Sequence, residues 1–141
     1  MEPLWNLRLS TEDDLPFILS SWLRGHRKAS VTSGISNTIY YRSQEALLKK
    51  LLAASVVVVA CAKDDVDQIF GYVCYEAVGG INLAVHWVYV KQPFRSLGMA
   101  RDLLQFARSA EHQVEWHTSR TRPSALTAAG TYNPYLIWSY A

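Results

Sequence analysis

Hydrophobic residues recur along the chain with two periods, one helical and one strand-like. Over residues 10–23 they fall on one helical face, at Leu15, Ile18, Leu19 and Trp22. Ser10 or Thr11 can cap this helix, because Asp13 or Asp14 follows three positions later as in a capping box. The pattern therefore predicts an amphipathic helix close to the start of the chain.

A second helix is predicted over Ser43–Ala54, where leucines are turned inward at Leu47, Leu48, Leu51 and Leu52. The segment Arg24–Arg42 between the two helices is polar, contains glycine and shows no period. We therefore expect a long loop there, and loops of this length are usually functional or mobile.

The strand-like segments lie at the start and in the middle of the chain. Leu4–Leu9 alternates between apolar and polar residues, as a half-buried strand does. Ser55–Ala62 is β-branched and continuously apolar, which favours a fully buried strand. Ile69–Ala77 and Ile81–Val90 are further strands, and the short turns around them predict antiparallel neighbours.

The helical period returns from about Gly98, and the predicted buried side consists of Met99, Leu103, Phe106, Ala107 and Ala110. A strand over Val114–Ser119, a helix between Pro123 and Gly130, and a closing strand "YLIWSYA" complete the order β-α-α-β-β-β-α-β-α-β. This order predicts an α/β fold with a mixed, mostly antiparallel central sheet flanked by helices. The 141 residues suit one domain over 1–141, with a shortened C-terminal part.

Composition narrows the class of protein. Half of the residues are apolar and 18% are charged, as in an ordinary globular domain, and the net charge of +2 is too small to argue for nucleic acid. No signal segment and no run near the roughly 18 apolar residues of a membrane span is visible. Cys61 and Cys74 lie in strand-like segments and are expected to be buried free thiols. We expect a soluble, cytoplasmic protein without a membrane partner.

The segment from Tyr89 to Ala107 runs from a strand through Arg95 into a helix that opens at Gly98. A helix N-terminus carries unpaired N–H groups and about half a positive charge, so it attracts anions. Gly98 has no side chain to block the approach of an anion, Ala100 is the next smallest residue, and Arg95 can fork onto phosphate oxygens. The segment therefore predicts a pyrophosphate cradle, although neither a dinucleotide fingerprint nor a Walker loop is present.

At these residues the chain resembles the GNAT superfamily of N-acetyltransferases. The acetyl-CoA signature of that family, Arg/Gln-x-x-Gly-x-Gly/Ala, stands here as Arg95-Ser96-Leu97-Gly98-Met99-Ala100. The preceding strand "VYVKQPF", the following helix and the order of the earlier elements also match, over roughly residues 5–120. The resemblance implies acetyl-CoA as cosubstrate and direct transfer of acetyl to an amine.

The resemblance also assigns cofactor-binding residues. The pantetheine arm would add to the strand at Val88, Tyr89 and Val90, bonding backbone groups at Val88 and Val90. The pyrophosphate would take N–H groups along the signature, from Arg95, Ser96, Leu97, Gly98, Met99 and Ala100. The thioester would lie where the strand ending at Val90 splays away from Val114–Ser119.

Three residues are candidates for proton transfer. His86 lies four residues before Val90, which places it on the same strand face as Val88 and Val90, and an imidazole suits base chemistry near neutral pH. A buried, hydrogen-bonded strand histidine is the structural alternative. Glu76 is a second candidate base or a carboxylate at the rim. Tyr132, or Tyr135, matches the family's general acid, but Gly130 ends the helix early and the usual C-terminal hairpin looks truncated.

The function that we predict is an N-acetyltransferase that moves acetyl from acetyl-CoA directly to an amine. The alternatives are a catalytically inactive GNAT-fold module that binds acyl-CoA or a protein, and a small α/β interaction module that binds another phosphate. The acceptor, a small molecule or a protein, stays open. His112 and His117 have no ligand partners at convincing spacing, so no metal is expected. The apolar end of the chain could pair with a second copy to form a homodimer.

Overall fold

The strands form one sheet in the order of the sequence. The computed structural model describes residues 4–28, 32–78, 82–111, 115–118 and 131–132. The strands within these ranges are β1 (Trp5–Leu9), β2 (Val56–Ala62), β3 (Ile69–Val78), β4 (Asn82–Val90), β5 (Glu115–Thr118) and β6 (Thr131–Tyr132). Neighbours from β1 to β4 are antiparallel, while β4–β5 and β5–β6 are parallel. The predicted mixed, mostly antiparallel sheet is confirmed.

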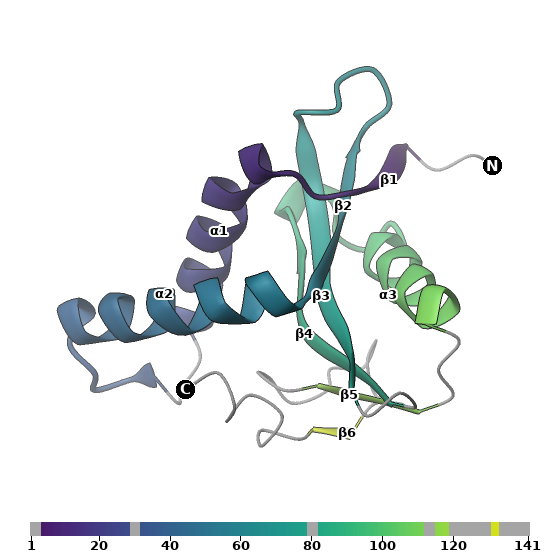
Figure 1. Cartoon of the computed structure of the whole chain (residues 1–141). Helices are drawn as coiled ribbons and strands as arrows, with labels where there is room; N and C mark the ends of the chain where they lie inside the picture. Colours follow the sequence, from purple (N-terminus) through teal and green to yellow (C-terminus); the bar gives the residue numbers. More distant parts are fainter. Residues whose placement is uncertain (1–3, 29–31, 79–81, 112–114, 119–130, 133–141) are drawn as a thin grey trace.

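Helices cover both faces of the sheet (Figure 1). α1 (Leu15–Arg27) and α2 (Asn37–Ala54) lie on one face, and α3 (Met99–Glu111) lies on the other. Each face has its own core: Trp22, Tyr40 and Leu51 pack on the first face with Tyr72 and Cys74 of β3, while Met99 and Leu103 pack on the second face with Val73 and Val85. No helix of the described residues is long and apolar enough to cross a membrane.

The expected long loop is much shorter in the structure. α1 continues to Arg27 and α2 begins at Asn37, where Ser36 Oγ accepts a hydrogen bond from the N–H of Ile39. The sequence Thr38-Ile39-Tyr40 has low helix propensity, so local preference does not predict a helix there. Tertiary contacts override that preference, because Tyr40 is 1% exposed and its hydroxyl donates to Leu23 O of α1 at 2.6 Å.

The helix faces also differ in detail from the predicted ones. Met99, Leu103 and Ala107 are buried as expected, but Phe106 is 41% exposed and Leu104 is buried in its place. The buried side of α3 is thus rotated about the helix axis, relative to the predicted one, toward Leu104. In α1, Leu15 is exposed because the helix begins at that residue, directly after a short 3₁₀ turn η1 (Glu12–Asp14). The side chain of Ala110 lies outside the described residues.

The predicted capping box is confirmed at the start of η1, directly before α1, and is tied to β1. The N–H of Thr11 donates to Asp14 Oδ2 at 2.8 Å. Arg8 of β1 forms a forked pair with Asp14, at 2.7 Å from Nη1 to Oδ2 and 2.9 Å from Nη2 to Oδ1. The Arg8 hydrogen bond holds the pKa of Asp14 below its usual value. This pair fixes where the chain leaves the sheet for the helix.

Only part of the predicted C-terminal region, residues 115–118 and 131–132, lies within the described residues. β5 falls within the predicted strand 114–119 and pairs with β4. The predicted helix over 123–130 and the closing strand over 135–141 lie outside the described residues. β6 is an addition that the pattern did not predict, and it places the backbone of Tyr132 in a strand beside β5 rather than in a helix.

Candidate functional site

β4 separates from β5 halfway along its length. Parallel pairing joins Asn82–Val85 to Glu115–Thr118 and ends at Val85 within the described residues. Leu83 to His86 are buried, whereas Trp87, Val88, Tyr89 and Val90 are only half-buried. Within the described residues, the last four residues of β4 therefore have no strand paired with them on the side away from β3, which is the edge to which the resemblance assigns the pantetheine arm.

A β-bulge at His86 marks the point of separation. In the pairing with β3, Val85 lies opposite Tyr75 and Trp87 lies opposite Cys74, so the register passes over His86. A bulge of this kind inserts one residue and shifts the two-residue alternation of side chains. Val85 and Val88 both pack on the α3 side, although they are three positions apart, an odd spacing that would put them on opposite faces of a regular strand. Counting back from Val90 by twos therefore does not give the face of His86.

The side chain of His86 lies on the opposite face from the one expected. Glu76 follows Tyr72 and Cys74 at two-residue steps, and both of these pack on the side of α1 and α2. His86 Nε2 lies 2.8 Å from Glu76 Oε1, so His86 is on that side as well. The predicted shared face of His86, Val88 and Val90 is wrong, because the bulge breaks the alternation between them.

The backbone groups of Val88 and Val90 point toward the exposed edge. The N–H of Lys91 donates to Phe70 O of β3 at 2.8 Å. In an antiparallel pair, alternate residues direct their N–H and C=O groups toward the partner strand. Lys91 and Tyr89 thus face β3, and Val88 and Val90 face away from it. These are the two positions at which the resemblance places the pantetheine bonds.

The start of α3 stands beside this edge. A 3₁₀ turn η3 (Gln92–Phe94) leads from β4 into the signature segment, where Ser96 has φ of 66° and Gly98 has φ of 89°. A Cβ added to Gly98 would meet no atom within 4 Å, so this residue borders open space. The N–H groups of Met99, Ala100 and Arg101 belong to the first turn of α3 and have no acceptor within the helix.

Two details modify the predicted cradle. The N–H of Arg95 already donates to Gln92 O at 3.2 Å, so we expect no pyrophosphate bond from that group. The Arg95 side chain is exposed, and its Nε donates to Val90 O at 2.9 Å. This bond leaves the two terminal guanidinium nitrogens as further donors and holds the side chain between the edge of β4 and the start of α3.

Gly71 of β3 allows α3 to lie this close to the sheet. A Cβ at Gly71 would stand 2.6 Å from Tyr89 O and 2.9 Å from Met99 Sδ. These contacts are shorter than van der Waals distance, so no larger residue fits without a shift. Gly71 therefore sets the depth of the first turn of α3 relative to β4.

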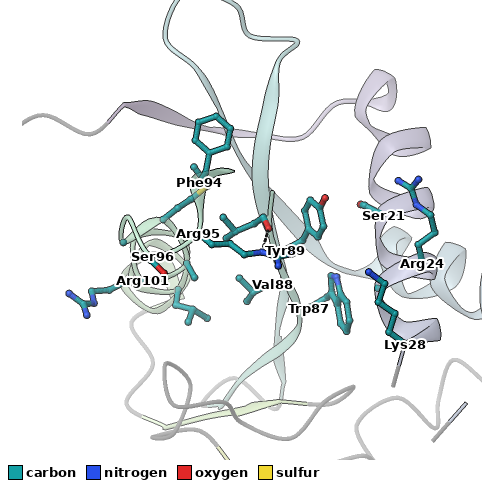
Figure 2. Close-up of a pocket in the computed structure, with 16 residues that line it drawn as sticks. Ser21, Arg24, Lys28, Trp87, Val88, Tyr89, Phe94, Arg95, Ser96 and Arg101 are labelled. Atoms are coloured by element: carbon teal, nitrogen blue, oxygen red, sulfur yellow. Dashed lines mark hydrogen bonds between the residues drawn. The ribbon is translucent and has the colours of Figure 1, made fainter. Parts of the chain in front are cut away.

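A cavity of about 910 Å³ joins these features (Figure 2). It is lined by Trp87 to Val90 of β4, by the start of α3 and by residues of α1 on the other face of the sheet. Of the 16 described residues that line it, four are cations, namely Arg24, Lys28, Arg95 and Arg101, and none is a carboxylate. The site is therefore suited to an elongated anionic ligand. Of the predicted cofactor-binding residues, Leu97 alone does not line it and is 52% exposed.

The predicted catalytic residues do not line this cavity. His86 and Glu76 form a pair next to it, in which the His86 side chain is 0% exposed and the Glu76 side chain is 16% exposed. The carboxylate of Glu76 is thus the member of the pair that solvent can reach. The side chain of Tyr132 lies outside the described residues, so its role stays a prediction.

Residues of α1 were missed by the sequence reasoning. Ser21, Arg24, Gly25 and Lys28 line the cavity, and Gly25 lets α1 approach Trp87, since a Cβ there would stand 3.0 Å from the Trp87 ring. The signal was available in the i, i+4 spacing of Arg24 and Lys28. It went unread because the helix was predicted to end before them.

Solved structures match the fold. No family model matches the chain, and no curated protein matches its sequence. A Pyrococcus furiosus protein whose acetyl transferase assignment is provisional matches with a TM-score of 0.66 and 17% identity, over 96% of this chain and 89% of that one. A possible acetyltransferase from Clostridium difficile 630 matches with a TM-score of 0.59 and 17% identity, over 87% and 84%.

The match extends to a protein solved with a ligand. The GNAT family N-acetyltransferase YhbS from Escherichia coli, in complex with CoA, matches with a TM-score of 0.54 and 19% identity, over 84% of this chain and 64% of that one. The protein has the fold of the GNAT acetyltransferases. The resemblance found in the sequence is confirmed at the level of the fold.

Proposed function

We propose that the protein is an acetyl-CoA-dependent N-acetyltransferase that moves acetyl directly to an amine. One observation carries the proposal: the cavity unites the exposed edge of β4 with the unpaired N–H groups at the start of α3. The CoA complex of YhbS, which has the same fold, adds support.

The residues around the cavity fit the chemistry of acyl-CoA. The N–H groups of Met99, Ala100 and Arg101 and the side chains of Arg95 and Arg101 would hold the pyrophosphate. Backbone groups of Val88 and Val90 would bond the pantetheine amides as an added strand does. Bound acetyl-CoA supplies the activated acyl group, and the chain supplies its position.

The state of the cysteines supports direct transfer rather than a covalent enzyme intermediate. Cys61 and Cys74 are free and buried. Burial raises the pKa of Cys74 to about 12, so this thiol is protonated at neutral pH and a poor nucleophile. We therefore assign a direct transfer without an acyl-enzyme: the amine nitrogen bonds the acetyl carbon, the resulting tetrahedral oxyanion collapses with cleavage of the C–S bond, CoA leaves as the thiolate, and the nitrogen loses a proton to a base.

The Glu76–His86 pair is our proposed acceptor of the amine proton. Glu76 is the member that solvent reaches, and the buried His86 orients its carboxylate through the 2.8 Å contact. We expect His86→Gln and Glu76→Gln each to lower kcat by about 10²-fold, with the Kd for acetyl-CoA nearly unchanged. Because the two side chains act as a unit, the double variant should be little slower than either single variant.

The test of the proposed function combines binding and turnover. Acetyl-CoA should raise the Tm and bind in calorimetry, while ATP as a phosphate control should not. CoA release, measured with a thiol reagent against a panel of amines, should then identify an acceptor. Absence of acetyl-CoA binding would refute the proposal.

A second candidate is a GNAT-fold module that binds acyl-CoA without catalysis. The specific observation in its favour is that neither His86 nor Glu76 lines the cavity. This alternative predicts acetyl-CoA binding with no CoA release above the uncatalysed rate for any amine. It also predicts that His86→Gln changes the stability of the protein and nothing else.

A further inference from the structure

The cavity has a second group of cations, on α1, across the edge of β4 from the start of α3. We propose that Arg24 and Lys28 bind an anionic group, carboxylate or phosphate, on a small acceptor amine. This inference rests on the proposed function and names the substrate class of the same site. It excludes polyamines and other purely cationic amines as the preferred acceptors.

The positions of the cations support two separate anion sites. Arg95 and Arg101 come from the α3 end of the cavity, where Arg95 lies against β4 and the Arg101 side chain points away from it, while Arg24 and Lys28 come from α1, with Tyr89 and Trp87 of β4 between Arg95 and α1 (Figure 2). The α3 end has the helix N-terminus and two cations for a pyrophosphate. A ligand that bonds the edge of β4 from the α3 side leaves the α1 side for the acceptor.

The charge balance of the α1 side calls for an anion. Arg24 and Lys28 are exposed and lie four residues apart on one helical face, an arrangement in which like charges repel. Among the described residues, no Asp or Glu lines the cavity and no ion pair involves either cation. Their charge therefore acts on whatever enters the cavity.

A third cation at the same helix end serves as a contrast. Arg27 donates to Thr32 O at 2.9 Å and to Ile35 O, and its guanidinium lies 4.8 Å from the centre of the Tyr40 ring. Arg27 thus has a structural role in joining α1 to the start of α2. Within the part of the chain that the structure describes, Arg24 makes one hydrogen bond, from Nε to Ser20 O of its own helix at 3.3 Å. The guanidinium nitrogens of Arg24 and the ammonium of Lys28 are consequently suited to a ligand.

The experiment compares matched acceptors. Amino acids are tested against their carboxamides, and phosphoethanolamine against ethanolamine, with spermidine as a cationic reference. We expect kcat/KM for the anionic member of a pair to be about tenfold or more above that of its neutral partner, as one charge-assisted bond gives. The carboxylate and phosphate pairs show which anion the site prefers.

Variants connect the preference to α1. Arg24→Gln and Lys28→Gln should raise KM for the anionic acceptor and leave KM for its neutral partner and the Kd for acetyl-CoA unchanged. Lys50→Gln removes an exposed charge on α2, away from the cavity, and should change none of these values. A matching Arg101→Gln variant should weaken acetyl-CoA instead.

The outcomes separate this inference from the function on which it rests. Equal turnover of acid and carboxamide, or an acid preference that survives in the Arg24→Gln/Lys28→Gln double variant, would overturn the inference and leave the transferase intact. Weaker acetyl-CoA binding in the α1 variants would reassign these cations to the CoA phosphates. If acetyl-CoA binds but no amine reacts, the shift in Tm caused by an N-acetyl amino acid is compared with that caused by its amide, both in the presence of CoA. Equal shifts for the acid and the amide also overturn the inference. If acetyl-CoA does not bind, the proposed function fails first.

Discussion

Replacement of Gly98 offers the sharpest test of where the cofactor binds. Gly98 has φ of 89°, a backbone conformation that residues other than glycine rarely adopt. It borders the cavity, and an added Cβ would meet no atom within 4 Å. Any larger residue therefore meets backbone strain but no clash. Gly98→Ala, Gly98→Gln and Gly98→Glu should all fold, with the same loss of stability.

The magnitudes follow from these two facts. A left-handed backbone costs an L-residue about 1–2 kcal/mol, which a domain with a stability of about 5–15 kcal/mol tolerates. Gly98→Gln and Gly98→Glu differ by one charge at nearly equal volume. A carboxylate about 4 Å from a phosphate costs about 1 kcal/mol in water and about 4 kcal/mol near a protein surface. Gly98→Glu should thus bind acetyl-CoA at least several-fold more weakly than Gly98→Gln.

The assay is calorimetric titration with acetyl-CoA, with urea unfolding as the control for stability. The difference between Gly98→Gln and Gly98→Glu should shrink between 50 mM and 500 mM salt, because ions screen repulsion at an exposed site. Equal affinity of the two variants would refute the placement of the phosphates beside Gly98. If Gly98→Ala, which adds no charge, already abolishes acetyl-CoA binding, then the backbone geometry at residue 98, and not charge, controls the site.

Three further predictions concern the framework of the site. Asp14→Asn should lower the free energy of unfolding by about 1–2 kcal/mol at pH 7, because the charged pair with Arg8 is lost. Since the pKa of Asp14 is lowered in the folded state, this difference from wild type should vanish as the pH falls below about 4 and through that pKa. A difference in stability that persists in unfolding curves at acid pH would contradict this reasoning. The thiol of Cys74 should not react with a disulfide reagent until the protein unfolds, because burial keeps it protonated; rapid reaction in native buffer would show that β3 opens locally. Gly71→Ala should destabilise the protein by about 1–3 kcal/mol through overpacking against Met99, and should weaken acetyl-CoA binding measured by calorimetry because the start of α3 is displaced; unchanged affinity would separate the depth of α3 from the cradle.

Much of the fold could be predicted from the sequence because local signals and burial agree. The continuous apolar segment at 55–62 and the alternating one at 4–9 correspond to β2 and β1, since a central strand is buried on both faces and an edge strand on one. The signature from Arg95 to Ala100 was recognisable because a positive φ and a helix start restrict the residue types that a few adjacent positions can hold.

The start of α2 could not be predicted because its cause is distant in the sequence. Tyr40 is buried through contacts with Leu23, His26 and Arg27 of α1, and nothing in the residues around Tyr40 encodes those partners. The exposed side chain of Phe106 has the same kind of explanation. Helical spacing defines a broad apolar side for α3, and packing on the sheet selects Leu104 over Phe106 within it.

The bulge at His86 is the feature that connects the fold to the proposed chemistry. The extra residue in β4 places the His86 side chain beside Glu76, on the face of α1 and α2. Val88 and Val90, which follow the bulge, lie on the face of α3. The same point is where the pairing of β5 with β4 ends within the described residues. A regular strand would put His86 and Val88 on one face and would allow no separation of the proton acceptor from the cofactor. The bulge thus gives a single strand two roles, with its edge available to a thioester and its histidine on the side from which we propose that the amine arrives.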